Sequence, residues 1–197
     1  MDGNKKNEAA HALGQKNRGH KVNITDIAIS KVQKARIKGL DDETLETVYQ
    51  SHKELLKFSK DRNDSNEVAG LLDITTGERL PFVKGDQVSV NVEADAASYH
   101  WLRTKPERSI LLLHNHPGQS YFSLNDISFF ASKAQIGIMT IVTNQGKIWW
   151  IRKSERYDFN AMKNAMRKAK QKCGGNEDKL VEIFLGECYT YGVERGG

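Results

Sequence analysis

The sequence predicts an α/β fold in which a mixed β-sheet is flanked by helices. Short apolar runs bounded by turn residues are typical of buried strands, and they occur at residues 68–74, 110–113 and 136–143. Segments with apolar residues at helical spacing precede, separate and follow these runs. At 197 residues the chain is long enough to bury a core of ordinary size. Alternating strands and helices of this kind favour a sheet covered by helices.

Residues 1–22 are rich in Asn, Lys, Gly and Gln and carry almost no large apolar side chains. This composition predicts a flexible arm. The arm lacks the apolar run of a signal peptide, and no later stretch is apolar enough for a membrane span. We therefore expect a cytoplasmic protein that has no membrane partner.

Residues 23–62 are expected to form a helical N-terminal extension. Apolar residues recur at helical spacing over residues 24–37, and the acidic run at 41–43 favours the start of a second helix that ends near Lys60. His52 falls on the inner face of this second helix, where we expect a half-buried packing residue rather than a ligand. The extension can cover one face of the sheet or dock a larger assembly.

Residues 63–155 are expected to form the core of the fold. The predicted elements are a hairpin of strands at 68–74 and 79–83, a third strand at 87–92, a helix at 93–103, a strand ending in His116, a helix after Ser123, and a second hairpin of strands at 136–143 and 147–151.

Residues 156–197 are expected to form C-terminal helices, at about 157–172 and 178–189, that finish in a loose Gly-Gly end. The chain has two cysteines, Cys173 and Cys188, and their spacing matches neither a Cys-x-x-Cys motif nor a zinc ribbon. We expect reduced thiols without a catalytic role.

The formal net charge is +5, from 30 basic and 25 acidic residues. Much of the excess lies in the N-terminal arm and in a basic stretch at 167–172. A solvated helix face explains such a stretch, and no aromatic platform or reader motif accompanies it. Nucleic acid is therefore not an expected partner.

Residues 110–126 carry the candidate chemistry. Four consecutive aliphatic residues predict a strand buried on both faces, and His114 and His116 stand at its end. Because residues i and i+2 of a strand point to the same side, the two imidazoles project together. A Pro-Gly pair ends the strand. Ser123 then precedes Asp126 by three residues at the start of a helical pattern, which brings the carboxylate back toward the histidines.

Two imidazole nitrogens and one carboxylate oxygen form a ligand set that suits zinc and leaves a fourth position for water. We therefore predict a zinc site at His114, His116 and Asp126. Ser123 and Asp126 can also be an N-cap residue and its reciprocal partner, and both interpretations stay open. A hydrolytic zinc site needs a base that is not a ligand, and Glu67, one residue ahead of an apolar strand, is the candidate.

An acidic residue ahead of a Gly-Leu-Leu strand, then His-x-His-Pro, then Ser-x-x-Asp, resembles the JAB/MPN metallopeptidase family, also called JAMM, over residues 66–151. The resemblance implies a three-layer fold similar to that of the cytidine deaminases. It also implies roles for five side chains: the zinc ligands His114, His116 and Asp126, the general base Glu67, and Ser123 as a group that stabilises the oxyanion.

One spacing departs from the commoner family pattern. Six residues, 117–122, separate the second histidine from the serine, where the commoner pattern has seven. The Ser-x-x-Asp spacing is intact, so only the connecting loop is shortened. This short form resembles a variant seen in phage-head-associated and mobile-element proteins.

These observations predict a zinc-dependent metallopeptidase or isopeptidase whose substrate is a peptide or an isopeptide-linked protein. Deubiquitinases of the family carry insertions that grip ubiquitin, and nothing here clearly corresponds to them. Two alternatives remain: a non-catalytic interaction or structural module, associated with a phage or mobile element and part of a larger assembly, and a protein associated with DNA processing. Occupation of all five motif positions favours the enzyme, because each matched position lowers the rate of chance matches.

Overall fold

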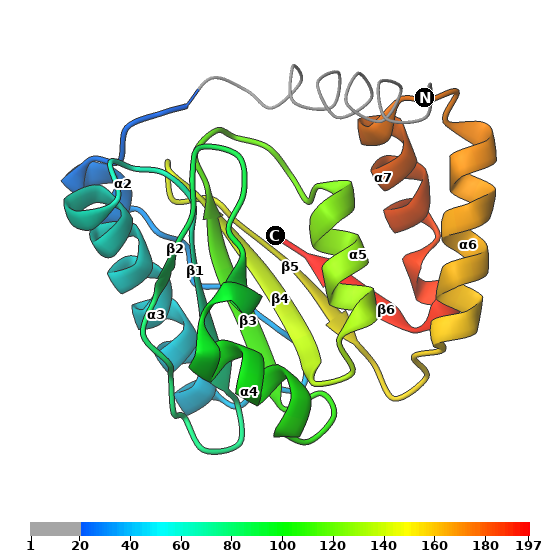
Figure 1. The fold of residues 1–197 in the computed structure, drawn as a ribbon, viewed down its shortest axis with the longest axis horizontal. Coiled ribbons are helices and arrows are strands. Elements are labelled where there is room, and N and C mark those ends of the chain that lie inside the picture. Colours follow the sequence, from blue (N-terminus) through cyan, green and yellow to red (C-terminus); the bar gives the residue numbers. More distant parts are fainter. Residues whose placement is uncertain (1–20) are drawn as a thin grey trace.

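One six-stranded β-sheet organises residues 21–197, the part of the chain that the computed structural model describes (Figure 1). The strand order is β2-β1-β3-β4-β5-β6. Strands β3 and β4 are parallel and every other neighbouring pair is antiparallel. The strands are β1 (Val68–Asp73), β2 (Val83–Lys84), β3 (Ile110–His116), β4 (Ile136–Thr143), β5 (Ile148–Lys153) and β6 (Val193–Gly196).

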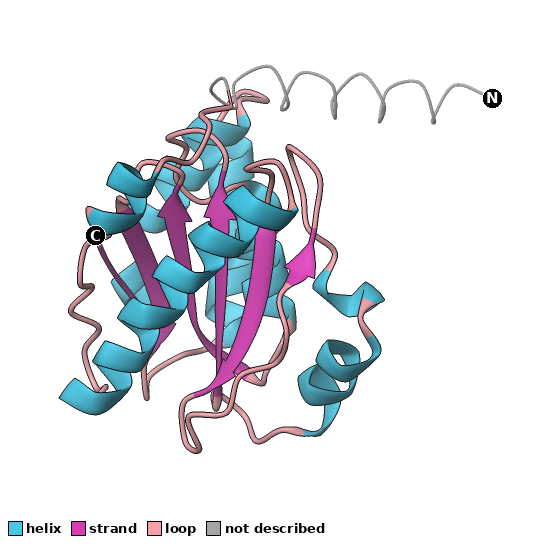
Figure 2. Cartoon of the chain, turned by 90° about the vertical axis from the view of Figure 1, so that its left-hand side faces the viewer, coloured by secondary structure: helices cyan, strands magenta, loops and turns pink. Residues whose placement is uncertain are grey.

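Helices cover both faces of the sheet, as Figure 1 shows. One face is covered by α2 (Asp26–Ser30) and α3 (Asp42–Arg62), and Figure 2 shows the long helix α3 lying across the strands. The other face is covered by α4 (Ala96–Thr104), α5 (Leu124–Ser132), α6 (Phe159–Lys172) and α7 (Glu177–Gly186), with the 3₁₀ turns η1 (Val92–Ala94) and η2 (Cys188–Tyr191). The predicted α/β class, a mixed sheet flanked by helices, is confirmed.

Strand β3 supplies side chains to both cores, because successive residues of a strand point to opposite faces. Ile110 and Leu112 pack in the core beneath α4 to α7, whereas Leu111 and Leu113 pack in the core beneath α2 and α3. All seven residues of β3 are buried. The strand is therefore enclosed on both faces, as its aliphatic run predicted.

Helix α3 follows its prediction closely. Asp41 caps its N-terminus by accepting a hydrogen bond from the Thr44 backbone N–H at 2.7 Å, and acidic residues occupy the first turn. His52 on this helix is fully buried. The half-buried position predicted for it was wrong, because the long helix lies directly against the sheet.

The first predicted helix, over residues 24–37, is much shorter than expected. Helix α2 ends at Ser30, and the chain then leaves the helix and runs beside the turn between β4 and β5. The backbone N–H of Gln33 donates to the Gly146 carbonyl at 3.2 Å, and a Cβ at Gly146 would lie 2.8 Å from the Ala28 carbonyl oxygen. Contact with this turn replaces the intrahelical hydrogen bonds that periodicity alone predicts.

The strand predicted at 79–83 forms only in part, and the strand predicted at 87–92 does not form. On the side of β1 away from β3, only β2 and one bridge between Leu72 and Arg79 form. After β2, the Asp86 carboxylate accepts hydrogen bonds from two following backbone N–H groups, of Val88 and Ser89, and so turns the chain away from the sheet. The helix predicted at 93–103 begins later, at Ala96, because Asp95 caps it.

The C-terminal segment is not purely helical, as residues 156–197 were predicted to be. The last predicted helix ends at Gly186, and the Gly-Gly end expected to be loose contains the final residue of β6, with Gly196 paired to Trp150 of β5. Helices α6 and α7 share their core with α5. Cys173 and Cys188 are buried free thiols, in agreement with the reduced state predicted for them.

Most of the predicted flexible arm, residues 1–20, lies outside the described residues. Its last two residues are held in place: Lys21 forms an ion pair with Asp64 at 2.8 Å, and the Val22 backbone N–H donates to the Pro117 carbonyl at 2.7 Å. Within residues 21–197 no helix combines the length and the apolar character that a membrane crossing requires.

Candidate metal centre

Strand β3 ends in the two histidines. His114 and His116 occupy alternate positions and therefore project toward the same face, the one covered by α5. Their exposed fractions are 3% and 5%. The strand continues in register with β4 as far as the pair His116 and Thr143, and the Asn144 backbone N–H then donates to the His116 carbonyl at 3.0 Å. Main-chain pairing up to the last residue of β3 fixes both imidazoles at the carboxyl end of this inner strand.

The N-terminus of α5 brings Asp126 to these histidines. Ser123 is the N-cap residue, and its hydroxyl accepts a hydrogen bond from the Asp126 backbone N–H at 3.1 Å. In return, the Asp126 carboxylate accepts hydrogen bonds from the Ser123 backbone N–H and hydroxyl, both at 2.6 Å. This is a complete capping box. The capping interpretation of Ser123 and Asp126 is confirmed, and it also holds the carboxylate in a fixed orientation.

The three predicted ligand side chains converge. The two Nε2 atoms of His114 and His116 are 3.1 Å apart. The Asp126 carboxylate oxygens lie 3.3 Å from the His114 Nε2 and 3.4 Å from the His116 Nε2. Atoms that coordinate one zinc ion tetrahedrally at about 2.0–2.1 Å lie about 3.3 Å from one another. The two Asp126 contacts are made by different oxygens. With one donor atom from each side chain, the three atoms lie within 4.8 Å of one another, close enough to converge on one cation.

The electrostatics of this cluster favour positive charge between the side chains. Burial would raise the pKa of Asp126, but the two imidazoles outweigh it and hold the pKa well below its ordinary value. Burial would lower the pKa of His116, but Asp126, together with nearby Glu67, raises it. A partly buried carboxylate that stays ionised beside two imidazoles is suited to a divalent cation.

Ser120 orients the His116 ring. Its backbone carbonyl lies 3.1 Å from the His116 Nδ1, and its hydroxyl lies 3.0 Å from the same atom. A carbonyl oxygen can only accept a hydrogen bond, so the Nδ1 donates to Ser120 and leaves the Nε2, which faces Asp126 and His114, as the atom that can bind a metal. Outer hydrogen bonds of this kind commonly fix metal-binding histidines. The sequence analysis missed Ser120. Its position in the short loop after the histidines could have indicated that it contacts the His116 ring.

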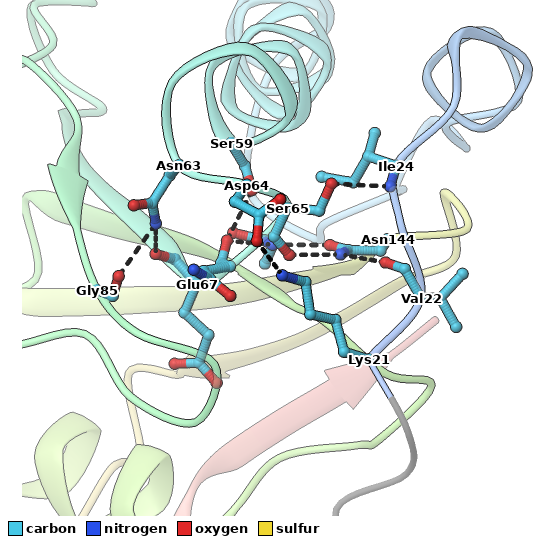
Figure 3. A network of polar contacts seen from close by, with 12 residues as sticks. Lys21, Val22, Ile24, Ser59, Asn63, Asp64, Ser65, Glu67, Gly85 and Asn144 are labelled. Atoms are coloured by element: carbon cyan, nitrogen blue, oxygen red, sulfur yellow. Dashed lines mark hydrogen bonds and ion pairs between the residues drawn. The ribbon is translucent and has the colours of Figure 1, made fainter.

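Glu67 reaches the same site from β1. Ala69 pairs with His114 across the antiparallel strands, so Glu67, two residues earlier, lies across from His116. The Glu67 main chain is held on both sides: its N–H donates to the Asp86 carbonyl, and its carbonyl accepts from the Gly85 N–H and the Asn63 side chain. Figure 3 shows the Glu67 carboxylate pointing away from this network.

A cleft of about 260 Å³ joins these residues. Four of the five predicted site residues line it: Glu67, His114, Ser123 and Asp126. The fifth, His116, contacts His114 and Asp126 directly. The structure therefore brings together every site residue that the sequence predicted.

Two asparagines that the sequence analysis missed support the site from behind. Asn115, between the two histidines, points to the opposite face and is fully buried. Its side chain accepts a hydrogen bond from the Val68 N–H at 2.7 Å and donates to the Asn66 carbonyl at 3.1 Å, so it binds the chain on both sides of Glu67. It also donates to the Asn144 side-chain oxygen at 2.7 Å. The bonds to Val68 and Asn66 tie the segment that carries Glu67 to β3.

Asn144 extends the support to the start of the described chain, as Figure 3 shows. Its side-chain amide donates to the carbonyls of Val22 and Ser65 at 2.7 and 2.8 Å. Ser65 and the preceding Asp64 have left-handed backbone conformations, with φ values of 57° and 49°. A turn this uncommon for non-glycine residues needs such external hydrogen bonds to persist.

Comparisons with protein-family models, with curated proteins and with solved structures find no match for this chain.

Proposed function

We propose that this protein is a zinc-dependent hydrolase of amide bonds with a fold of the JAB/MPN type. The observation that supports it most directly is the convergence of His114, His116 and Asp126, which bring one donor atom each within 4.8 Å of one another, as ligands of one metal ion must be. An uncharged ligand pair and one carboxylate leave a fourth position open, as in catalytic rather than structural zinc sites.

The remaining site residues supply the groups that amide hydrolysis requires. Zinc bound by the three ligands would lower the pKa of water toward neutrality and polarise the substrate carbonyl. Glu67, across the strands from His116, takes the proton from the attacking water and delivers it to the nitrogen of the amine that leaves. A new C–O bond forms and the C–N bond breaks.

Ser123 lies on the wall of the cleft and is suited to stabilise the oxyanion. Its hydroxyl donates to Asp126, but its backbone N–H donates to the same carboxylate oxygen. The hydroxyl can therefore turn toward the substrate while the N–H keeps the carboxylate in place.

The experiment that tests this function is elemental analysis of protein purified without chelator or nickel, combined with peptide hydrolysis. We expect about one zinc per chain in wild type and in Glu67→Gln, and none in His116→Ala. Turnover should fall about 10²–10⁴-fold in Glu67→Gln although zinc remains bound. Absence of zinc from all three proteins, even after zinc is added, would contradict the proposal and favour a non-catalytic interaction module.

A further inference from the structure

The cleft that contains Glu67 and His114 continues beyond the metal ligands as an apolar pocket. Its floor is the face of the sheet next to the site, formed by Ala69 of β1, Leu112 of β3 and Met139 of β4. Leu112 stands two residues before His114 on the same face, and Met139 pairs with it across β3 and β4. The floor carries no charged group.

Two walls rise from this floor. Helix α5 forms one wall, with Phe129 facing the cleft and Asp126 at the metal end. The segment after β2 forms the other, with Val90 and Val92 facing the cleft. This segment was predicted to be a strand, but it leaves the sheet after the Asp86 turn and lines the cleft instead.

An ion pair closes the end of the pocket far from the metal ligands. Glu93 follows the apolar wall, and Lys133 stands at the C-terminal end of α5. The Lys133 Nζ lies 2.6 Å from the Glu93 Oε1, so the two walls are joined there. The pocket is thus open toward Glu67 and His114 and apolar at its floor, and its walls carry the polar residues Ser89, Asn91 and Asn125 beside the apolar ones.

We propose that this pocket binds one large apolar side chain of the polypeptide substrate, in a residue that flanks the amide bond to be cleaved. The inference rests on the proposed function and narrows its substrate class. The apolar floor and the apolar side chains of both walls favour burial of an aliphatic or aromatic side chain. A tail ending in Gly-Gly would leave the pocket empty. The substrate is therefore a peptide with a large apolar residue beside the cleaved bond rather than an isopeptide that ends in glycines.

Met139 makes the pocket directly observable without any enzymatic activity. The chain has four methionines, and Met162 and Met166 lie on α6, away from the cleft. In protein labelled with ¹³C at the methionine methyl groups, N-acetyl-leucinamide should shift the Met139 signal saturably and leave the α6 signals unchanged. N-acetylglycinamide should shift none of them. A Met139 signal that ignores the leucine probe, or responds equally to the glycine probe, overturns the proposal.

Variants distinguish a loss of binding caused by filling the pocket from one caused by a general change in the fold. Val90→Phe fills the pocket from its wall, and Ala69→Val fills it from its floor. Both should weaken the response to N-acetyl-leucinamide at least tenfold. The matched control is Ile29→Phe, which enlarges a partly buried residue on the opposite face of the sheet and should leave the response unchanged. An equal loss in the control would overturn the assignment.

Hydrolysis of an equimolar peptide mixture distinguishes failure of this inference from failure of the proposed function. The peptides differ at one residue, which is Leu, Phe, Gly or Lys, and the zinc-loaded protein should cleave beside Leu or Phe at least 10²-fold faster than beside Gly. Cleavage of all peptides at equal rates overturns the proposed role of the pocket and supports the proposed hydrolase function. A saturable Met139 response without cleavage of any peptide supports the pocket and overturns the hydrolase.

Discussion

The two faces of strand β3 differ in what their polar residues do. On the face toward α5, His114 lines a cleft, His116 lies beside it, and Asp126 raises the pKa of His116 against the effect of burial. On the face toward α3, Asn115 is fully buried. Its side-chain amide forms hydrogen bonds with the main chain of Val68 and Asn66 and with the Asn144 side chain. One face presents groups that can bind a ligand, and the other holds those groups in position.

The buried histidine behind the site shows the same contrast. The His52 Nε2 lies 2.8 Å from the Thr140 hydroxyl of β4. Burial, and to a smaller extent the nearby His114, lowers the pKa of His52 to about 3, so this imidazole stays neutral. The face toward α5 favours a cation, whereas the face toward α3 excludes positive charge.

The largest effect on stability should come from the face toward α5, where the proposed zinc ligands lie. Zinc should raise the free energy of unfolding of wild type by about 4 kcal/mol when free zinc is about a thousand times its Kd. Asp126→Ala should abolish this increase, whereas Asp178→Ala, an exposed change in the first turn of α7, should retain it. Denaturant unfolding in buffered zinc measures both. Equal stabilisation of wild type and Asp126→Ala would mean that zinc binds elsewhere.

Removing the Asn115 side chain, which supports the site from the other face, should lower the free energy of unfolding by nearly as much. Asn115→Ala should lower the free energy of unfolding by about 2–4 kcal/mol, because it leaves buried partners at Val68 and Asn144 without their hydrogen bonds. Urea denaturation followed by circular dichroism measures the loss. Asn160→Ala, an exposed change on α6, should stay within about 0.5 kcal/mol of wild type. A wild-type midpoint for Asn115→Ala would show that water replaces the lost bonds.

The neutral state of His52 predicts a dependence on pH. The unfolded chain binds a proton to this residue below about pH 6.5, while the folded protein does not until about pH 3. Stability should therefore fall as the pH drops through this window, by at most about 1.4 kcal/mol per pH unit from this residue. His52→Gln should flatten the slope of unfolding free energy between pH 6.5 and 5.

The control for this slope is His100→Gln, which changes an exposed histidine on α4. Its slope should equal that of wild type. If the slope of His52→Gln also equals that of wild type, the imidazole accepts a proton in the folded state and the contrast between the two faces fails.

The smallest effect on stability concerns the two roles of Ser123. As an N-cap residue it should contribute about 1 kcal/mol relative to alanine, and Ser123→Gly should cost only a few tenths of that amount. As an oxyanion-stabilising group it should matter much more: both variants should lose about 10²–10³-fold in kcat. Thermal unfolding and single-peptide kinetics measure the two roles separately. A kcat that follows stability alone would leave Ser123 with only the capping role.

Elements that depend on neighbours a few residues away were predictable. The aliphatic run of β3, the alternation that places His114 and His116 on one side, and the Ser-x-x-Asp start of α5 are all local patterns. Helix α3 was predictable for the same reason, since its cap and its inner face lie within one segment. The ligand set of the candidate site followed from these local rules.

Contacts between distant segments were not predictable. The turn at Gly146 ends α2 early, and pairing with β5 turns the final glycines into a strand. The segment at 87–92 has strand-like composition, yet it leaves the sheet after the Asp86 turn. Periodicity describes which face of a segment is apolar, but it does not say which partner covers that face or whether the edge of a sheet accepts another strand.

The sequence by itself therefore determined the donor atoms and their local geometry: two histidines on one side of a strand end and a carboxylate at a helix start. The tertiary structure alone decided what surrounds them. It placed Glu67 across from His116, joined both strands through Asn115, and left an apolar pocket beside His114. The physical reason is range, because caps and strand alternation are set within a few residues, whereas strand pairing and buried hydrogen bonds form only when distant segments pack.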